Sequence, residues 1–179
     1  MSSVVISGDT SGAITLAAPS VAGTNTITLP AATGTAMVSG NMPAFRAYKS
    51  TDQTGLSSNT LTKVTFDTVV YDTNSNYSTA NSRFTPTVAG YYMVNAQIVP
   101  VATAMTNQQF AIYKTGSENA NIYYRSTVSD FAFQNSALVV MNGSTDYIEI
   151  YTKITGASGI YVASGVSNCW FSAVLVRAL

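Results

Sequence analysis

The 179-residue sequence contains no histidine and a single cysteine, Cys169. Without histidine the chain has no imidazole that could act as a general base, and it lacks a common ligand of zinc and iron sites. A single cysteine forms neither an intrachain disulfide nor a thiolate metal cluster. The sequence therefore predicts a structural or binding protein that is not an enzyme, with no catalytic residues, no cofactor and no metal.

Charged side chains are also scarce. They make up 9% of the chain, with 8 Lys+Arg against 8 Asp+Glu, whereas an ordinary soluble domain carries about 25%. Nucleic acid is not an expected partner, because binding phosphates requires a surplus of clustered Lys and Arg. No membrane partner is expected either, because the apolar runs fall short of the ~20 residues that cross a bilayer. No basic start of a secretory signal is visible.

Aromatic side chains are missing from residues 1–42, which also contain only one charged residue, Asp9. Every Tyr, Phe and Trp lies in residues 43–179. A segment without large side chains buries too little apolar area to fold alone, since each buried CH₂ contributes only about 0.8 kcal/mol. We therefore expect two parts: an N-terminal arm, residues 1–42, for anchoring or trimerisation, and a folded domain, residues 43–179.

The arm contains three short runs of β-forming residues, at 4–6, 13–16 and 26–29, separated by turn-forming residues. In the second and third runs two aliphatic residues alternate with threonine, as on the two faces of a strand. This pattern predicts small strands. A flexible linker rich in Gly, Ser and Thr is the alternative.

From Phe45 onward the pattern is all-β. The clearest strand, residues 146–154, alternates isoleucine with polar residues. Glu149 and Lys153 lie on its polar face and are expected to form either a surface pair along the strand, worth about 0–1 kcal/mol, or a contact between protomers. Asn142-Gly143 predicts a hairpin turn. Further strands are predicted at residues 62–66, 91–99, 109–114, 131–141 and 169–177. Many short strands separated by turns predict a β-sandwich or a jelly roll.

Five separated pieces of residues 44–179 resemble, in the same order, the C1q/TNF-like jelly-roll family. The core piece is residues 83–94, RFTPTVAGYYMV, which is similar to the family's F-x-P-x-x-x-G-x-Y stretch. The other pieces are residues 66–68, 77–79, 136–150 and 170–176, with Ala173 where the family usually has Gly. The resemblance implies an all-β, C1q/TNF-like jelly-roll β-sandwich preceded by a short β-rich arm. It also implies a homotrimer in which each protomer packs an apolar face around a three-fold axis.

Two pieces of the arm, residues 14–19 and 25–35, resemble a module of bacteriophage fibre and other virion proteins. This resemblance implies a non-enzymatic virion protein, located on the capsid surface or as a tail appendage. The absence of long shaft repeats favours a capsid decoration or cement protein that binds the major capsid protein through residues 1–42. The alternative is a short tail fibre, attached to a tail or baseplate protein, with a receptor- or glycan-binding tip.

One ligand site is proposed from the sequence. Tyr123, Tyr124, Arg125 and Phe131 lie in stretches rich in Asn and Gln. Aromatic rings beside such polar groups stack on sugars and hydrogen-bond their hydroxyls, which makes a host surface glycan a candidate partner. Ordinary core and trimer packing of the same residues is the alternative.

A calcium loop is not predicted. Residues 72–76 match the first ligands of such a loop, but Tyr77 replaces the required Gly and Arg83 stands where a bidentate Glu belongs. The aspartates are too dispersed along the chain to define another metal site.

Catalysis is not predicted either. Cys169 is expected to be a buried, inert thiol. A hydrolase needs two cooperating carboxylates, and the two glutamates, Glu118 and Glu149, form no recognisable acid/base pair in the sequence. A free, secreted sugar-binding module is a further alternative, which the missing signal disfavours.

Overall fold

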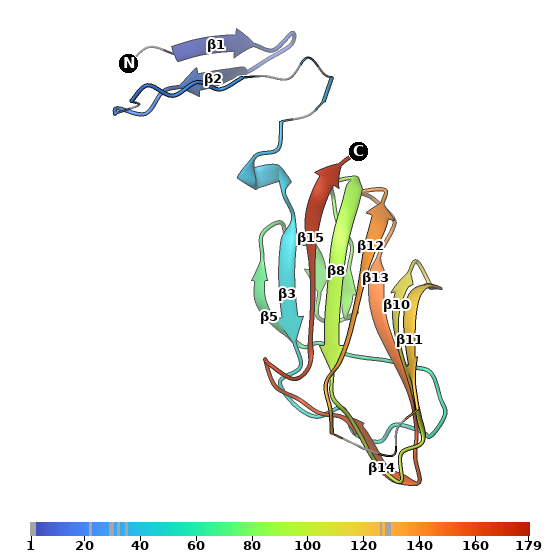
Figure 1. Cartoon of the computed structure of the whole chain (residues 1–179). Helices are drawn as coiled ribbons and strands as arrows, with labels where there is room; N and C mark the ends of the chain where they lie inside the picture. Colours follow the sequence, from blue (N-terminus) through green and yellow to red (C-terminus); the bar gives the residue numbers. More distant parts are fainter. Residues whose placement is uncertain are drawn as a thin grey trace. The chain divides into compact units, whose positions relative to one another are not determined.

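The computed structural model describes residues 3–21, 23–28, 31, 33–34, 36–125, 127 and 130–179. Over these residues the regular structure is β-strands and one short 3-10 helix, η1 (Ser39–Asn41) (Figure 1). The chain divides into two compact units, Met1–Gly34 and Thr35–Leu179. In the described part of the chain, no helix is long and apolar enough to cross a membrane.

The first unit contains an antiparallel hairpin of β1 (Ser3–Ser7) and β2 (Ala13–Ala17). These strands confirm the first two predicted runs of the arm. The third run is not a strand over residues 26–28, and Leu29 lies outside the described residues. Alternation alone does not make a strand. A strand also needs a hydrogen-bonded neighbour, and residues 26–28 have none within the described part of the chain.

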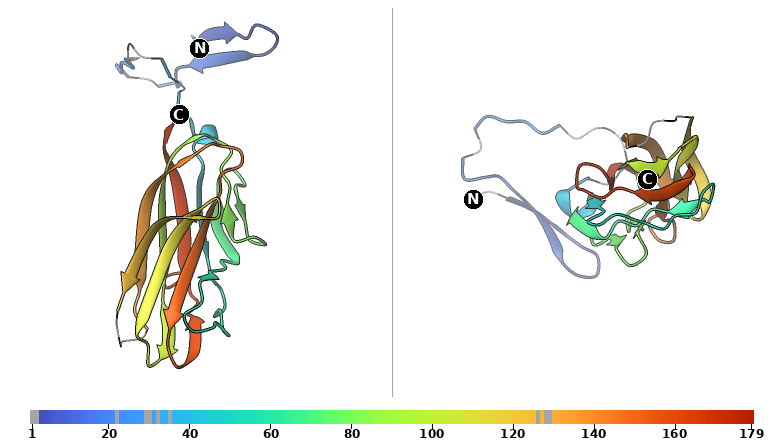
Figure 2. Two further views of the ribbon diagram at one scale, coloured as in Figure 1. Left: turned by 90° about the vertical axis from the view of Figure 1, so that its right-hand side faces the viewer. Right: turned by 90° about the horizontal axis from the view of Figure 1, so that it is seen from below.

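The second unit is built mainly from two antiparallel sheets. The five-stranded sheet has the order β12 (Phe133–Met141), β8 (Gly90–Ile98), β15 (Trp170–Ala178), β3 (Ala44–Tyr48) and β5 (Thr68–Asp72). The six-stranded sheet has the order β11 (Ser117–Tyr124), β10 (Asn107–Lys114), β13 (Ile148–Thr155), β7 (Arg83–Phe84) and β6 (Tyr77–Ser78), and β4 (Thr62–Lys63) also pairs with β13. A short pair, β9 (Pro100–Thr103) and β14 (Ser158–Val162), completes the unit, and Figure 2 shows the same strands from two further sides. Neighbours in each sheet are mostly distant in sequence, as in a jelly roll.

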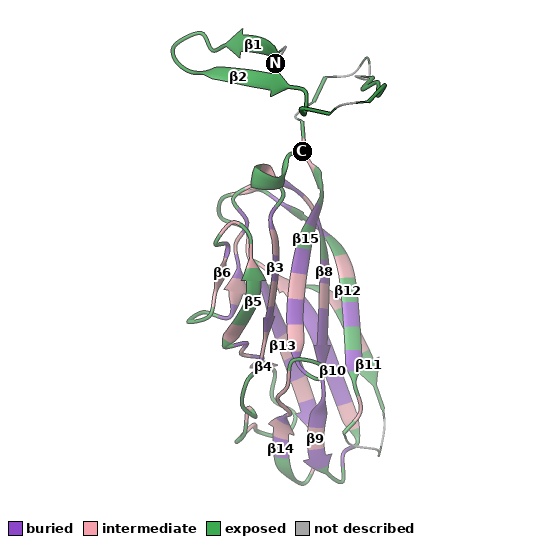
Figure 3. Cartoon of the chain, turned by 90° about the vertical axis from the view of Figure 1, so that its left-hand side faces the viewer, coloured by how far each residue is buried: buried purple, intermediate pink, exposed green. Residues whose placement is uncertain are grey.

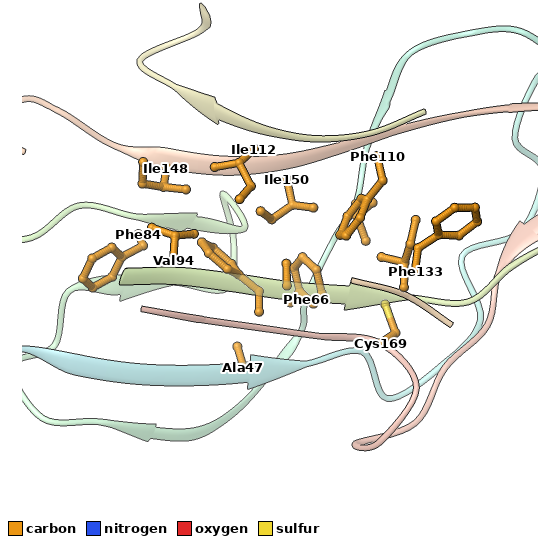
Figure 4. Packing of buried hydrophobic residues seen from close by; sticks show 14 of the residues in the cluster. Ala47, Phe66, Phe84, Val94, Phe110, Ile112, Phe133, Ile148, Ile150 and Cys169 are labelled. Atoms are coloured by element: carbon orange, nitrogen blue, oxygen red, sulfur yellow. The ribbon is translucent and has the colours of Figure 1, made fainter. Parts of the chain in front are cut away.

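The core lies between the two sheets and is mostly apolar, with a few buried polar side chains such as Thr152. Val94 on β8 and Ala47 on β3 face Ile150 on β13, and all three are fully buried (Figure 4). The ring centre of Phe45 lies 4.4 Å from that of Phe84 and 4.7 Å from that of Phe171. Because apolar side chains from both sheets share this space, their burial holds the sandwich together.

Asn142-Gly143 does not form the predicted hairpin. The strands on either side of it, β12 and β13, belong to different sheets, so the turn crosses from one layer to the other. The Asn142 side-chain oxygen accepts hydrogen bonds from the backbone N–H groups of residues 144–146, each at 3.0 Å. Gly143 has a φ of +72°, and a Cβ at this position would collide with the backbone of Ala89. The Asn142-Gly143 dipeptide indicated the positive φ, but it did not indicate that the strands before and after it belong to different sheets.

Glu149 does not form the predicted surface pair with Lys153. It is only 3% exposed, and its Oε1 lies 3.0 Å from Arg83 Nη2 and 3.1 Å from Lys63 Nζ. Two residues four apart on one strand are separated by about 13 Å, since each residue advances roughly 3.3 Å. The cations therefore come from the neighbouring strands β4 and β7.

Replacing this carboxylate is expected to destabilise the fold. In Glu149→Gln the two cations lose their partner but keep contact with water, since about a third of each side chain is exposed, and the free energy of unfolding should fall by about 2 kcal/mol. Urea denaturation followed by circular dichroism measures the change. The matched control is Glu118→Gln, at the exposed other glutamate, which should change the free energy of unfolding by less than about 1 kcal/mol. Equal effects of the two substitutions would contradict a buried ion-pair role.

Candidate functional site

The outer face of the five-stranded sheet carries a row of apolar side chains. The strand register places Ala44, Val174, Met93 and Leu138 next to one another on β3, β15, β8 and β12. Leu138 is 56% exposed, Val174 42% and Met93 37%. Figure 3 shows the alternation of buried and exposed positions along β12 and β15. We call these four residues the aliphatic row; it contains no charge, and exposed apolar patches of this kind mark interaction surfaces.

The rows on one side of it are polar, whereas on the other side the next row holds Tyr91 and Val140, which is 42% exposed. Arg46 lies with its guanidinium 4.6 Å from the ring centre of Trp170 and donates a hydrogen bond to the carbonyl of Val166. Gln97 donates to the carbonyl of Ser167 and accepts from the Gln134 amide. A hollow of about 300 Å³ lies here, lined by Asn95, Ala96, Gln134, Asn135, Ser136 and Trp170. The face therefore offers both an apolar contact and hydrogen-bonding groups.

The structure separates the four residues of the proposed ligand site. Tyr123 and Tyr124 are consecutive on β11, so they point to opposite sides of the sheet. The ring centre of Tyr124 lies 5.3 Å from that of Phe131, which packs against the core. Tyr123 is 57% exposed on the other side, with Lys153 Nζ 6.0 Å from its ring centre. Arg125 is exposed just beyond β11. The structure thus gives Tyr124 and Phe131 a packing role, and a ligand role for the four residues stays a prediction.

Sequence reasoning missed the neighbours of Tyr123. Gln109 is its partner on β10, and the rings of Tyr113 and Tyr151, on β10 and β13, have their centres 4.5 Å apart on the same outward side. The period-two alternation of residues 109–113 indicates that Gln109, Ala111 and Tyr113 point to the same side of β10, away from the core. Which strands lie beside β10 could not be read from the sequence, so the cluster was not visible there.

The aspartates do not gather into a metal site. Asp72 accepts hydrogen bonds from the backbone N–H groups of Tyr77, at 2.7 Å, and Asn74, so its carboxylate closes its own turn. Asp146 forms an ion pair with Lys114 at 2.9 Å. Among the described residues, no group of three or more His, Cys, Asp or Glu side chains is arranged to hold a metal ion.

Cys169 is fully buried, as the sequence predicted. Burial raises the pKa of its thiol to about 12. The thiol is therefore neutral at physiological pH, and a neutral thiol is a poor nucleophile. This position supports a packing role for the cysteine.

Comparisons with known proteins find matches that cover most of the second unit. The sequence profile of the C1q domain matches residues 44–176. The structure of murine APRIL at pH 5.0 is similar with a TM-score of 0.59 and 7% identity, covering 75% of this chain and 99% of that chain. The structure of the Eiger TNF of S. frugiperda is similar with a TM-score of 0.54 and 11% identity. The match covers 78% of this chain and 95% of that chain. At such identities the structures show the fold alone, and they confirm the predicted C1q/TNF-like jelly roll. A search of curated proteins finds no match.

The thiol of Cys169 is expected to be unreactive in the folded protein. Iodoacetamide at pH 8 should leave the native chain unmodified and should modify it fully in guanidinium chloride, as measured by intact-mass spectrometry. Because the pKa of the folded thiol lies above its ordinary value of 9.0, the stability gained from the protonated form is complete below pH 9 and is lost as pH rises towards 12. Rapid modification of the native protein would contradict this prediction.

Proposed function

The chain belongs to the C1q domain family, and we propose that it is a non-enzymatic homotrimer displayed on a bacteriophage particle as a capsid decoration (cement) protein. The fold family supports the trimer, and the resemblance of the arm to virion proteins supports the particle. Residues 43–179 form the trimeric body, and residues 1–42 form the arm that attaches it to the major capsid protein. The observation that carries the proposal is the aliphatic row, an uncharged, exposed strip on the body of a domain type that is typically trimeric.

The aliphatic row suits self-association. Each copy presents the same strip, so a closed ring of copies uses identical contacts throughout. Burying Met93, Val174 and Leu138 requires no charge to leave water, which avoids the large desolvation penalty of interfacial ions. The polar rows beside the strip provide the hydrogen bonds that interfaces need around an apolar centre.

The arm supports attachment to a further surface. The hairpin register places Val4 opposite Leu16 and Ile6 opposite Ile14, so one face of the hairpin is aliphatic. These four side chains are 56–67% exposed. An isolated two-stranded hairpin is marginally stable in water, so this face needs a protein surface to cover it. The resemblance of the arm to modules of phage virion proteins supports a capsid shell as that surface.

A short tail fibre with a receptor- or glycan-binding tip is the second candidate. The observation that favours it is the exposed ring of Tyr123 beside Lys153, a pair suited to a sugar. In this case the arm attaches to a tail or baseplate protein. Immunogold electron microscopy of intact particles separates the two: label over the whole shell supports decoration, and label confined to the tail supports a fibre. Absence of the protein from purified virions contradicts both.

A charge in the aliphatic row is expected to dissociate the trimer. Light scattering of the wild-type chain should give three times the 18.8 kDa of one copy. Leu138→Asp should give the monomer mass, because a carboxylate would then be buried in the interface. The control, Asn119→Asp, adds the same charge at an exposed position on β11 and should remain trimeric. A monomeric wild-type protein at high concentration would refute the trimer.

A charge on the aliphatic face of the hairpin is expected to prevent attachment. Ile14→Asp should bind particles that lack the protein at least about tenfold more weakly, a loss of about 1.4 kcal/mol, as measured by cosedimentation. Thr15→Asp, the matched control, lies on the opposite face beside Val5 and should bind nearly normally. The melting temperature of both variants should match wild type, because the core residues lie in the second unit. Equal loss in both variants would contradict attachment through the aliphatic face.

A further inference from the structure

We propose that the outer face of the six-stranded sheet is a carbohydrate-binding platform. Its residues come from β11, β10 and β13, and its occupant is a saccharide chain lying across these strands. The inference rests on the proposed function only in that the body must remain accessible on the assembly. Its test uses the purified full chain and does not require a particle.

The strand register assembles the platform in three rows. Each row runs from β11 through β10 to β13, and every member lies on the side away from the core. The rows are Tyr123–Gln109–Lys153, Asn121–Ala111–Tyr151 and Glu118–Tyr113–Glu149. Gln109, Ala111 and Glu149 are buried members of these rows, and the members around them are aromatic, amide and charged side chains. Because the side chains stand on strands, their positions are fixed before any ligand arrives, which lowers the entropic cost of binding.

Three tyrosine rings form the floor of this face, and two of them are tilted against each other. Ala111 points outward at the centre of the face and is nevertheless fully buried, so the larger side chains around it lie over it. The ring centres of Tyr113 and Tyr151 are 4.5 Å apart with an interplanar angle of 46°. Beside them the ring of Tyr123 is 57% exposed. An exposed aromatic ring can receive the apolar C–H face of a pyranose, as aromatic side chains do in many small-molecule sites.

Polar groups at the edge of this floor are held in place. Both carboxylate oxygens of Glu118 accept hydrogen bonds: Oε2 from the Gln109 amide at 2.7 Å, and Oε1 from the Asn121 amide. Gln109 itself is only 5% exposed, so it serves as a fixed support for the exposed carboxylate. A carboxylate oxygen can accept a second hydrogen bond, which a sugar hydroxyl can donate. The platform therefore offers stacking and hydrogen bonding side by side.

The second glutamate is already occupied. Glu149 is buried and bound by Arg83 and Lys63, and Tyr151 donates a hydrogen bond from its hydroxyl to the Oε2 of Glu149. This contact fixes the Tyr151 ring and leaves Glu118 as the carboxylate open to a ligand. The two glutamates thus have different roles on the platform: one orients an aromatic ring, and the other faces solvent.

The chemistry of the face favours a sugar over an aliphatic protein surface or a nucleic acid. None of the residues of β10, β11 and β13, all of which are described, is an exposed large aliphatic side chain, in contrast to the aliphatic row on the other sheet. The apolar self-association expected of the aliphatic row is therefore not expected of this face, whose aromatic, amide and carboxylate groups suit a sugar. The charges on and beside the platform are few, with Lys63, Arg83, Arg125 and Lys153 against Glu118 and Glu149, and they lack the clustered surplus of Lys and Arg that a polyanion needs.

A printed array of defined neutral and acidic oligosaccharides, probed with the labelled full chain, tests the proposal. Wild-type protein should bind at least one oligosaccharide, whose affinity is then measured by titration. Tyr123→Ala should weaken that affinity about tenfold, equivalent to about 1.4 kcal/mol. Glu118→Gln, which keeps the shape of the side chain and removes its charge, should also weaken it. The matched control is Tyr71→Ala, because Tyr71 is 47% exposed on β5 of the other sheet, and this variant should bind like wild type.

Two results would overturn the platform: no oligosaccharide bound above background by the wild-type chain, or Tyr71→Ala weakening binding as much as Tyr123→Ala. Circular dichroism and light scattering on every variant verify that folding and assembly are unchanged. A platform that fails in a protein that is still trimeric leaves the proposed virion role intact. A monomeric protein that still binds oligosaccharide leaves the platform intact.

Discussion

The packing of two sheets through apolar side chains is the constraint on which the other features of the body depend. A strand that buries every second residue must show the residues between them to the outside. Once Val94, Ile112 and Ile150 are fixed in the core, the residues next to them on the same strands must point to the outer face of the sheet. The aliphatic row and the aromatic platform therefore both follow from the same buried layer, because they are the outward-facing residues of the two sheets that enclose it.

The two outer surfaces differ in chemistry although they belong to one sandwich. The five-stranded sheet shows Met93, Leu138 and Val174, which associate well with another apolar surface and poorly with water. The six-stranded sheet shows tyrosines and amides, which tolerate water and still offer stacking. Under the two proposals above, one face serves assembly and the other recognition, without competition between them. The low charge of the chain is compatible with both uses.

Much of the fold was predictable because long strands have clear alternation. The strands β8, β10, β12, β13 and β15 were all anticipated from this pattern and from the order of the family pieces. The two-residue strands β6 and β7 are too short to show a period. Asn142-Gly143 signalled a positive φ but could not reveal that its flanking strands enter different sheets. Glu149 was misjudged because its partners, Arg83 and Lys63, are distant in sequence. The candidate site was only partly visible: Tyr123 could be named, but its neighbours depend on which strands lie side by side.

The hairpin of the first unit has no charged residue in either strand. Contacts made through such a surface respond to solution conditions differently from ionic contacts. Raising ionic strength does not screen them, and strongly hydrated salts such as sulfate strengthen them. Cooling weakens them, because the driving force is largely the entropy of released water. A protein held in this way is retained in concentrated brine and is shed most easily in the cold.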